Sequence, residues 1–168
     1  MGASAETVLF WIFAVPLIAS AAGVVAARNP VHAAMSLVSA FFWLAGIYVL
    51  LTAHLLAFVQ VIVYAGAIMV LFLFVVMLLS LTDAELGLEK LSALKWVGVV
   101  GAAGMLVLVV SALAQSGPRA MRAVGADFGT VRAVGRILFT QYLLPFEATS
   151  VLLLVAIVGA VVVAKEKI

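Results

Sequence analysis

Few side chains in this 168-residue sequence could carry out chemistry: it has no cysteine and two histidines, His32 and His54. On a single helix these histidines would lie about 33 Å apart, so they cannot share a haem or a metal ion within the chain. The lack of cysteine removes thiolate nucleophiles, cysteine zinc sites and ordinary iron-sulfur clusters. The sequence therefore predicts no catalytic residue, no cofactor bound by this chain and no metal site.

Glu147 is the only charged residue between Arg136 and Lys165. An ionisable residue within a membrane span is a functional hypothesis by default. Two interpretations stay open for Glu147: a first-turn carboxylate stabilised by the helix dipole, or a proton-handling carboxylate that faces a partner subunit. A relay across a bilayer core of about 30 Å needs several such groups, so the chain alone is a poor candidate for a proton pump.

Gln60 and Tyr64 form an unusual polar pair in an apolar stretch and are followed at once by Ala65, Gly66 and Ala67. The spacing of four predicts that Gln60 and Tyr64 share one face of a helix. The three small residues favour one of two interpretations. They permit close packing of a neighbouring helix, or they mark a point where the helix can change its hydrogen-bond register, as π-bulges do at functional sites.

The composition predicts a membrane protein, because 68% of the residues are hydrophobic and only 9 basic and 7 acidic side chains are present. Soluble proteins average about 45 to 50% apolar and about 25% charged residues. The natural solvent for this chain is a lipid bilayer. The basic residues form no run, so nucleic acid is not an expected partner.

The uncharged runs predict an all-α, polytopic membrane protein whose single domain has five transmembrane helices. Residues 29–82 contain no formally charged side chain and would make a helix of about 80 Å, so they must fold back once, at Thr52-Ala53-His54. Asn29 and Pro30 favour an N-cap and a first helical residue. The five expected spans are about 7–27, 31–52, 55–81, 96–114 and 143–164, with a loop at 115–136 before the last.

Glycine and proline refine these spans. Pro16 is expected to kink the first one, and Pro145 either lies in the first turn of the last one or kinks it. Gly98, Gly101 and Gly104 are interpreted as a helix-packing face of the fourth span.

An odd number of spans places the two termini on opposite sides of the membrane. Five lysines and arginines lie near span ends on the C-terminal side and four on the other. The positive-inside rule therefore favours an N-terminus outside and a C-terminus in the cytoplasm.

Residues 60–79, QVIVYAGAIMVLFLFVVMLL, closely resemble the third transmembrane helix of subunit J of bacterial NADH:quinone oxidoreductase (respiratory complex I), the equivalent of mitochondrial subunit 6. Two stretches support this resemblance: NPVHA at 29–33 is similar to the start of the family's second helix, and GRILFTQYLLPFE at 135–147 to the approach to its fifth. Glu147 matches a glutamate of the family.

The resemblance implies a non-redox, multi-pass subunit of the translocase in the cell inner (plasma) membrane, inactive when isolated. Its partners would be other membrane-arm subunits of the respiratory chain complex and the lipid bilayer. Flavin mononucleotide, iron-sulfur clusters and quinone would be bound by partner subunits. In the family, a π-bulge in helix three is thought to interconvert with regular helix and to open or close a water path that couples quinone reduction to proton translocation. The matching positions here are Tyr64, Gly66 and Phe72, with Gln60 beside them.

Three alternatives to complex I stay open. The chain could belong to a related oxidoreductase with another electron donor, to a cation antiporter complex, or to a purely structural membrane scaffold. An antiporter subunit should carry buried charges in several spans or broken helices, and only Glu147 and Pro16 point that way.

Overall fold

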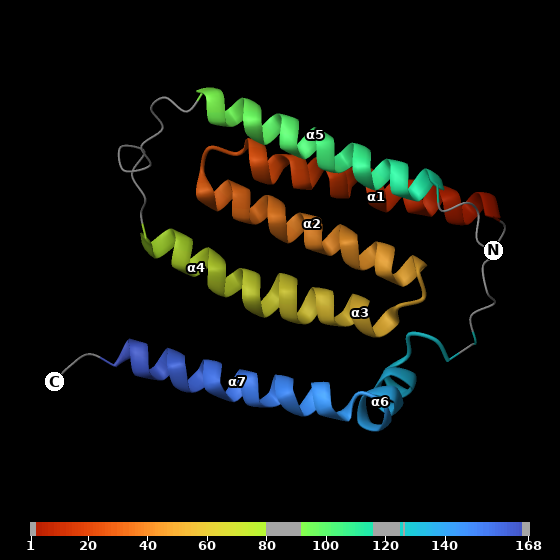
Figure 1. Cartoon of the computed structure of the whole chain (residues 1–168), viewed down its shortest axis with the longest axis vertical. Coiled ribbons are helices and arrows are strands. Elements are labelled where there is room, and N and C mark those ends of the chain that lie inside the picture. Colours follow the sequence, from red (N-terminus) through yellow and green to blue (C-terminus); the bar gives the residue numbers. More distant parts are fainter. Residues whose placement is uncertain (1–2, 80–91, 116–124, 126, 166–168) are drawn as a thin grey trace. The chain divides into compact units, whose positions relative to one another are not determined.

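The structure is a computed structural model that describes residues 3–79, 92–115, 125 and 127–165. Every element in this part of the chain is a helix, as Figure 1 shows. The elements are α1 (Ala3–Ala26), α2 (Pro30–Leu50), α3 (His54–Val59), η1 (Gln60–Ile68), α4 (Met69–Leu79), α5 (Ser92–Gln115), α6 (Val131–Thr140) and α7 (Leu143–Ala164).

Within the described residues, five helical stretches are long and apolar enough to cross a membrane: Ser4–Ala26, Pro30–Leu50, His54–Leu79, Val97–Gln115 and Leu143–Ala164. The prediction of an all-α membrane protein with five spans is confirmed. The chain divides into two compact units, one formed by residues 1–73 with 125–168 and the other by residues 74–124. The first unit contains α1, α2, α3, η1, α6 and α7, and it carries the features described below.

Small residues allow α1 and α2 to pack closely as an antiparallel pair. A Cβ atom on Gly46 would overlap the ring of Phe13, so only glycine fits at this crossing. One polar contact also joins the two helices, because the hydroxyl oxygens of Ser20 and Ser39 lie 3.1 Å apart. α1 continues through Pro16 as one helix.

The two tight connections lie where the sequence predicts them. The Asn29 side chain accepts a hydrogen bond from the Val31 N–H at 2.9 Å, and Pro30 is the first residue of α2. At the other end α2 stops at Leu50. Thr52 then adopts a positive φ of 58°, which is uncommon for a β-branched residue and turns the chain sharply before α3.

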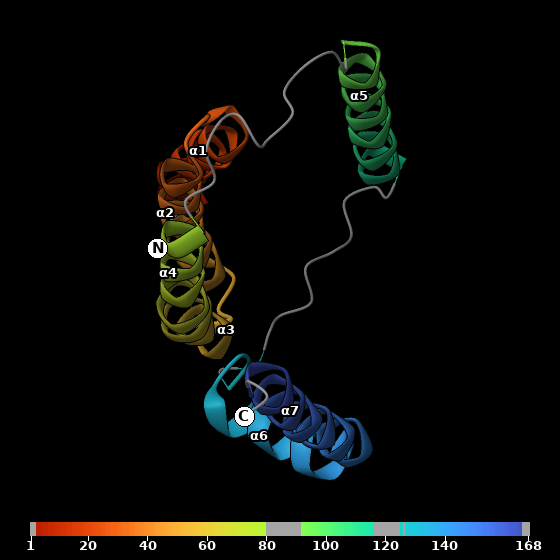
Figure 2. The same cartoon turned by 90° about the vertical axis from the view of Figure 1, so that its left-hand side faces the viewer.

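The expected loop at 115–136 differs from the structure, because its last six residues belong to helix α6. The Thr130 side chain caps α6 by accepting a hydrogen bond from the Ala133 N–H at 3.2 Å. Figure 1 views α6 nearly along its axis while α7 lies in the plane of the picture, so the two helices cross at a steep angle (Figures 1 and 2). Residues 131–136 belong instead to an amphipathic helix.

The turn between α6 and α7 is fixed by an edge-to-face contact of Phe139 with Phe146, whose ring centroids are 4.9 Å apart. α7 begins at Leu143, so Pro145 lies in its first turn. Pro145 therefore has the first-turn role and not the kinking one, and its missing N–H costs no helical hydrogen bond there.

Candidate functional site: the π-helical part of the third span

The third span is made of α3, η1 and α4 in direct succession, and its middle part is π-helical over nine residues. A π-helix bonds each N–H to the carbonyl five residues back instead of four. The Met69 N–H still donates to the Tyr64 carbonyl, five residues before it. π-helical turns are rare and occur often at functional sites. This segment is the candidate functional site.

Gly66 lies where the wide turn brings two parts of the backbone together. A Cβ atom on residue 66 would lie 3.2 Å from the carbonyl oxygen of Val61, five residues back. That is tighter than ordinary van der Waals contact, so a side chain here would push the Val61 carbonyl aside. Ala65 and Ala67 on either side add no branched side chains. The local sequence therefore accommodates the π register at the point where it is most crowded.

Gln60 and Tyr64 differ in exposure. Gln60 is 6% exposed whereas Tyr64 is 45% exposed. No hydrogen bond joins their side chains in the described part of the chain. That the two side chains share one face of the helix therefore stays a prediction.

The Tyr64 ring packs instead against Phe41 of α2. Their centroids are 6.0 Å apart with an interplanar angle of 75°, an edge-to-face geometry that aromatic pairs favour. Ala40 and Ala45 are buried on α2, where their small side chains permit close packing of the neighbouring helices. Phe41 could not be predicted, because the sequence alone does not show which of its 10 phenylalanines contacts Tyr64.

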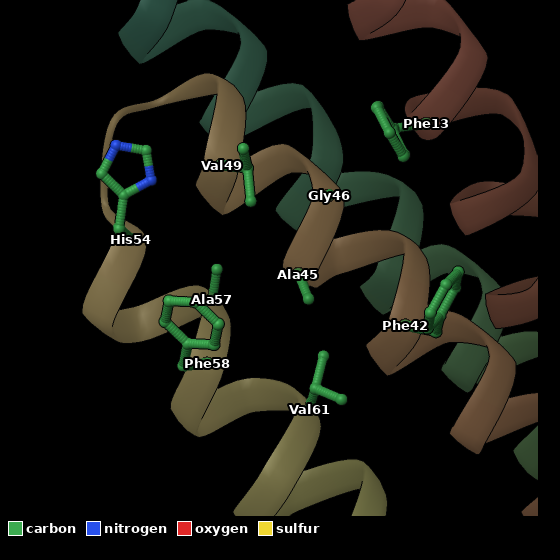
Figure 3. Close-up of a pocket in the computed structure, with 9 residues that line it drawn as sticks. All are labelled: Phe13, Phe42, Ala45, Gly46, Val49, His54, Ala57, Phe58 and Val61. Carbon is green, nitrogen blue, oxygen red and sulfur yellow. The ribbon is translucent and has the colours of Figure 1, made fainter.

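A hollow of about 380 Å³ lies between α1, α2 and the first part of the third span. Figure 3 shows its aromatic lining, with Phe13 from α1, Phe42 from α2 and Phe58 from α3. Val61 of η1 also lines it, and among the described residues that line it His54 is the only titratable one. A single titratable group cannot form a proton relay, so this hollow is suited to hydrocarbon.

Phe72 and Glu147 lie outside the π-helical segment. Phe72 is on α4, four residues after the end of η1, and its side chain is 46% exposed. Glu147 is the fifth residue of α7, so the interpretation that it lies in the first turn is wrong. Its side chain is exposed, and α7 makes no contact with η1 in the described residues. Glu147 is therefore available to groups outside this chain.

The two histidines lie at opposite ends of α2, His32 in its first turn and His54 after its end. Among the described residues there is no group of three or more His, Asp or Glu side chains that could hold a metal ion. The features together define a polytopic membrane protein of five spans with a π-helical interruption in the third.

Comparison with known proteins identifies the family. The model of the family "NADH-ubiquinone/plastoquinone oxidoreductase chain 6" matches residues 20–163. The chain is 37% identical to subunit J of the NADH-quinone oxidoreductase of Rhodobacter capsulatus, over 90% of this chain and 78% of the relative. It is 40% identical to subunit 10 of the enzyme of Thermus thermophilus, over 86% and 81%. The F(420)H(2) dehydrogenase subunit J of Methanosarcina mazei is 37% identical, over 98% and 94%. The chain belongs to this chain 6, or subunit J, family of complex I.

Proposed function

We propose that the chain is a membrane-arm subunit of a proton-pumping NADH:quinone oxidoreductase, and that η1 is a conformational gate that couples quinone reduction to proton translocation. The observation that carries this proposal is the nine-residue π-helical segment at the middle of a membrane span. In this proposal other membrane-arm subunits are the partners, and flavin, iron-sulfur clusters and quinone are bound by partner subunits.

A change of register in η1 would produce a large local rotation. Each residue of an α-helix adds about 100° and about 1.5 Å. If one π turn reverts to the α register, the extra residue in that wide turn becomes an ordinary α-helical residue. The helix after it, α4, then rotates by about 100° relative to α3. Phe72 would then leave the surface that it occupies here and present its ring to another. Such helix register shifts occur in microseconds to milliseconds, which is compatible with enzymatic turnover.

The rotation gives the gate its effect on water. A phenylalanine ring fills space that water molecules would need, so moving Phe72 opens a water path in one register and closes it in the other. Protons would pass along this path between carboxylates of neighbouring subunits. Glu147 is a candidate for one such carboxylate on this chain, because it lies within a membrane span, is exposed, and makes no contact with η1.

The proposed setting is the plasma membrane, with the N-terminus outside and the C-terminus in the cytoplasm. A second candidate function is supported by the F(420)H(2) dehydrogenase relative, which aligns with 98% of the chain. In that case the same membrane subunit would serve an oxidoreductase with another electron donor. The polypeptides that co-purify with the chain in mild detergent distinguish these two candidates.

The gate is tested by the reactivity of position 72. The chain has no cysteine of its own, so Phe72→Cys introduces a single thiol whose labelling can be followed on this subunit after denaturing electrophoresis. We expect the rate of modification by a permeant maleimide to differ between resting and turning-over complex. Leu108→Cys, on the exposed surface of α5, serves as the control whose rate stays constant. Equal rates at position 72 in both states would exclude the gate and leave the family assignment untouched.

A further inference from the structure

Helix α6 has two chemically different sides. Val131, Val134 and Leu138 lie along one side, and Arg132 and Arg136 lie one turn apart on the other. Both arginine side chains are exposed, and neither makes an ion pair with any residue in the described part of the chain. Two exposed guanidinium groups on one side of an amphipathic helix are typical of a surface that meets anions.

The connections of α6 fix its depth in the membrane. The Leu55 N–H donates a hydrogen bond to the Gly129 carbonyl at 3.0 Å, which ties the approach to α6 to the beginning of the third span. Gly129 has a φ of +70°, and a Cβ atom there would collide with the Thr52 carbonyl, so this anchor requires glycine. Beyond α6, α7 begins at Leu143 and enters the membrane. Both ends of α6 are therefore attached to the ends of spanning helices on one side.

Length and orientation place α6 along the membrane surface. Its ten residues measure about 15 Å, half of the hydrocarbon thickness. It also crosses α7 at a steep angle (Figures 1 and 2). Tyr142, which follows α6, is exposed, and tyrosine is enriched at the membrane–water interface. These properties are those of an interfacial amphipathic helix.

We propose that Arg132 and Arg136 form a binding site for the phosphate of anionic phospholipid headgroups, with the apolar side of α6 in contact with the acyl chains. Guanidinium groups bind phosphate oxygens by paired, charge-assisted hydrogen bonds. The net negative charge of lipids such as phosphatidylglycerol adds an attraction that zwitterionic lipids lack. At a surface that is rich in anionic lipid, this attraction corresponds to about fivefold for each basic residue. This site is independent of the gate in η1.

The proposal is tested by local lipid enrichment around the full-length chain in bilayer nanodiscs. A fluorophore on Thr140→Cys, on the arginine side of α6, reports collisions with lipids that carry a nitroxide near the headgroup. We expect labelled phosphatidylglycerol to quench it at a several-fold lower mole fraction than labelled phosphatidylcholine. The double variant Arg132→Gln/Arg136→Gln should lose this preference, and Arg132→Lys/Arg136→Lys should keep most of it.

Arg28→Gln is the matched control, because it removes one exposed arginine at the opposite end of α2 and should leave the preference unchanged. Equal quenching by the two lipids around the parental chain overturns the proposal. A preference that persists in the double glutamine variant also overturns it. If the parental chain shows no preference and the double variant yields less assembled complex, the arginines bind an acidic partner protein instead of lipid.

Discussion

Gly66 is the position in the π-helical segment where adding a single methyl group tests the proposed gate. In Gly66→Ala the new Cβ would lie 3.2 Å from the Val61 carbonyl oxygen, so the backbone must move by a few tenths of an ångström to relieve the contact. A regular α-helix accommodates alanine readily. The substitution therefore raises the free energy of the π register relative to the α register.

The size of this effect follows from the costs of overpacking. Inserting carbon atoms into a packed site costs about 1 to 3 kcal/mol. One methyl group lies at the lower end, and about 1 kcal/mol shifts an equilibrium about fivefold. Alanine also favours helix over glycine by about 1 kcal/mol, but this gain applies to both registers and does not change their ratio. Gly66→Leu adds three further carbons and should shift the ratio more strongly.

The assay compares two activities of the same assembled complex. NADH oxidation by an artificial acceptor at the flavin end should be unchanged, because no redox group is near this segment in the proposed function. Quinone reduction coupled to proton pumping should fall about fivefold in Gly66→Ala if each turnover visits both registers, and further in Gly66→Leu. All rates are normalised to assembled complex, since packing at Gly66 also affects assembly.

Gly159→Ala is the matched control, because Gly159 lies in α7 and a Cβ there would meet no atom of this chain within 4 Å. It gains the same helix propensity without the crowding, so its coupled rate should equal that of the parent. The reasoning fails if fully assembled Gly66→Leu complex reduces quinone and pumps protons at the parental rate. The third span would then be a packing element only.

Other substitutions and the isolated chain test further parts of the proposal. Tyr64→Phe keeps the ring against Phe41 and removes no hydrogen bond to Gln60, so coupled activity should fall less than in Gly66→Leu. Phe41→Ala removes an aromatic pair worth about 0.5 to 1.5 kcal/mol, so it should lower coupled activity by a factor of about 2 to 10. Glu147→Gln should leave assembly and the artificial-acceptor rate intact and reduce the number of protons pumped per quinone, measured with a pH-sensitive dye in vesicles. The full-length chain alone in liposomes should leave an imposed pH gradient unchanged, and specific dissipation above protein-free controls would support an antiporter instead. In intact cells an impermeant thiol reagent should label Ser4→Cys and not Lys165→Cys, and the reverse pattern would show that the topology is inverted.

The spans were predictable because a charged side chain in hydrocarbon costs so much that uncharged runs outline the membrane segments. The turn at Thr52 was also predictable, since a continuous helix over residues 29–82 would be far longer than the bilayer is thick. At Asn29 and Pro30 the local chemistry specifies a helix start by itself. These features depend on residue type alone, so one sequence suffices to locate them.

The π register could not be read from composition. Both registers make similar numbers of backbone hydrogen bonds, so small residues at 65–67 permit the wide turn without requiring it. The contact that holds Tyr64 lies 23 positions away in sequence, at Phe41, and only packing reveals it.

Helix α6 was missed for a different reason. Residues 115–136, which contain four arginines, were expected to form a loop as a whole, and this expectation hid a local pattern at their end. The spacing of Val131, Val134 and Leu138 opposite Arg132 and Arg136 is the signal that would have found it. Thr130 supplies the matching N-cap.

In the proposed gate, the packing of the third span determines which end moves. α2 packs against both α3 and η1, and Ala57 and Gln60 are buried there. The Leu55 N–H is bonded to Gly129, so the first part of the span is held at its end as well as along its side. A register change within η1 cannot rotate α3 without breaking these contacts. The rotation is therefore transmitted to α4, where Phe72 lies, and this is the direction in which a backbone change at Gly66 would alter a water path.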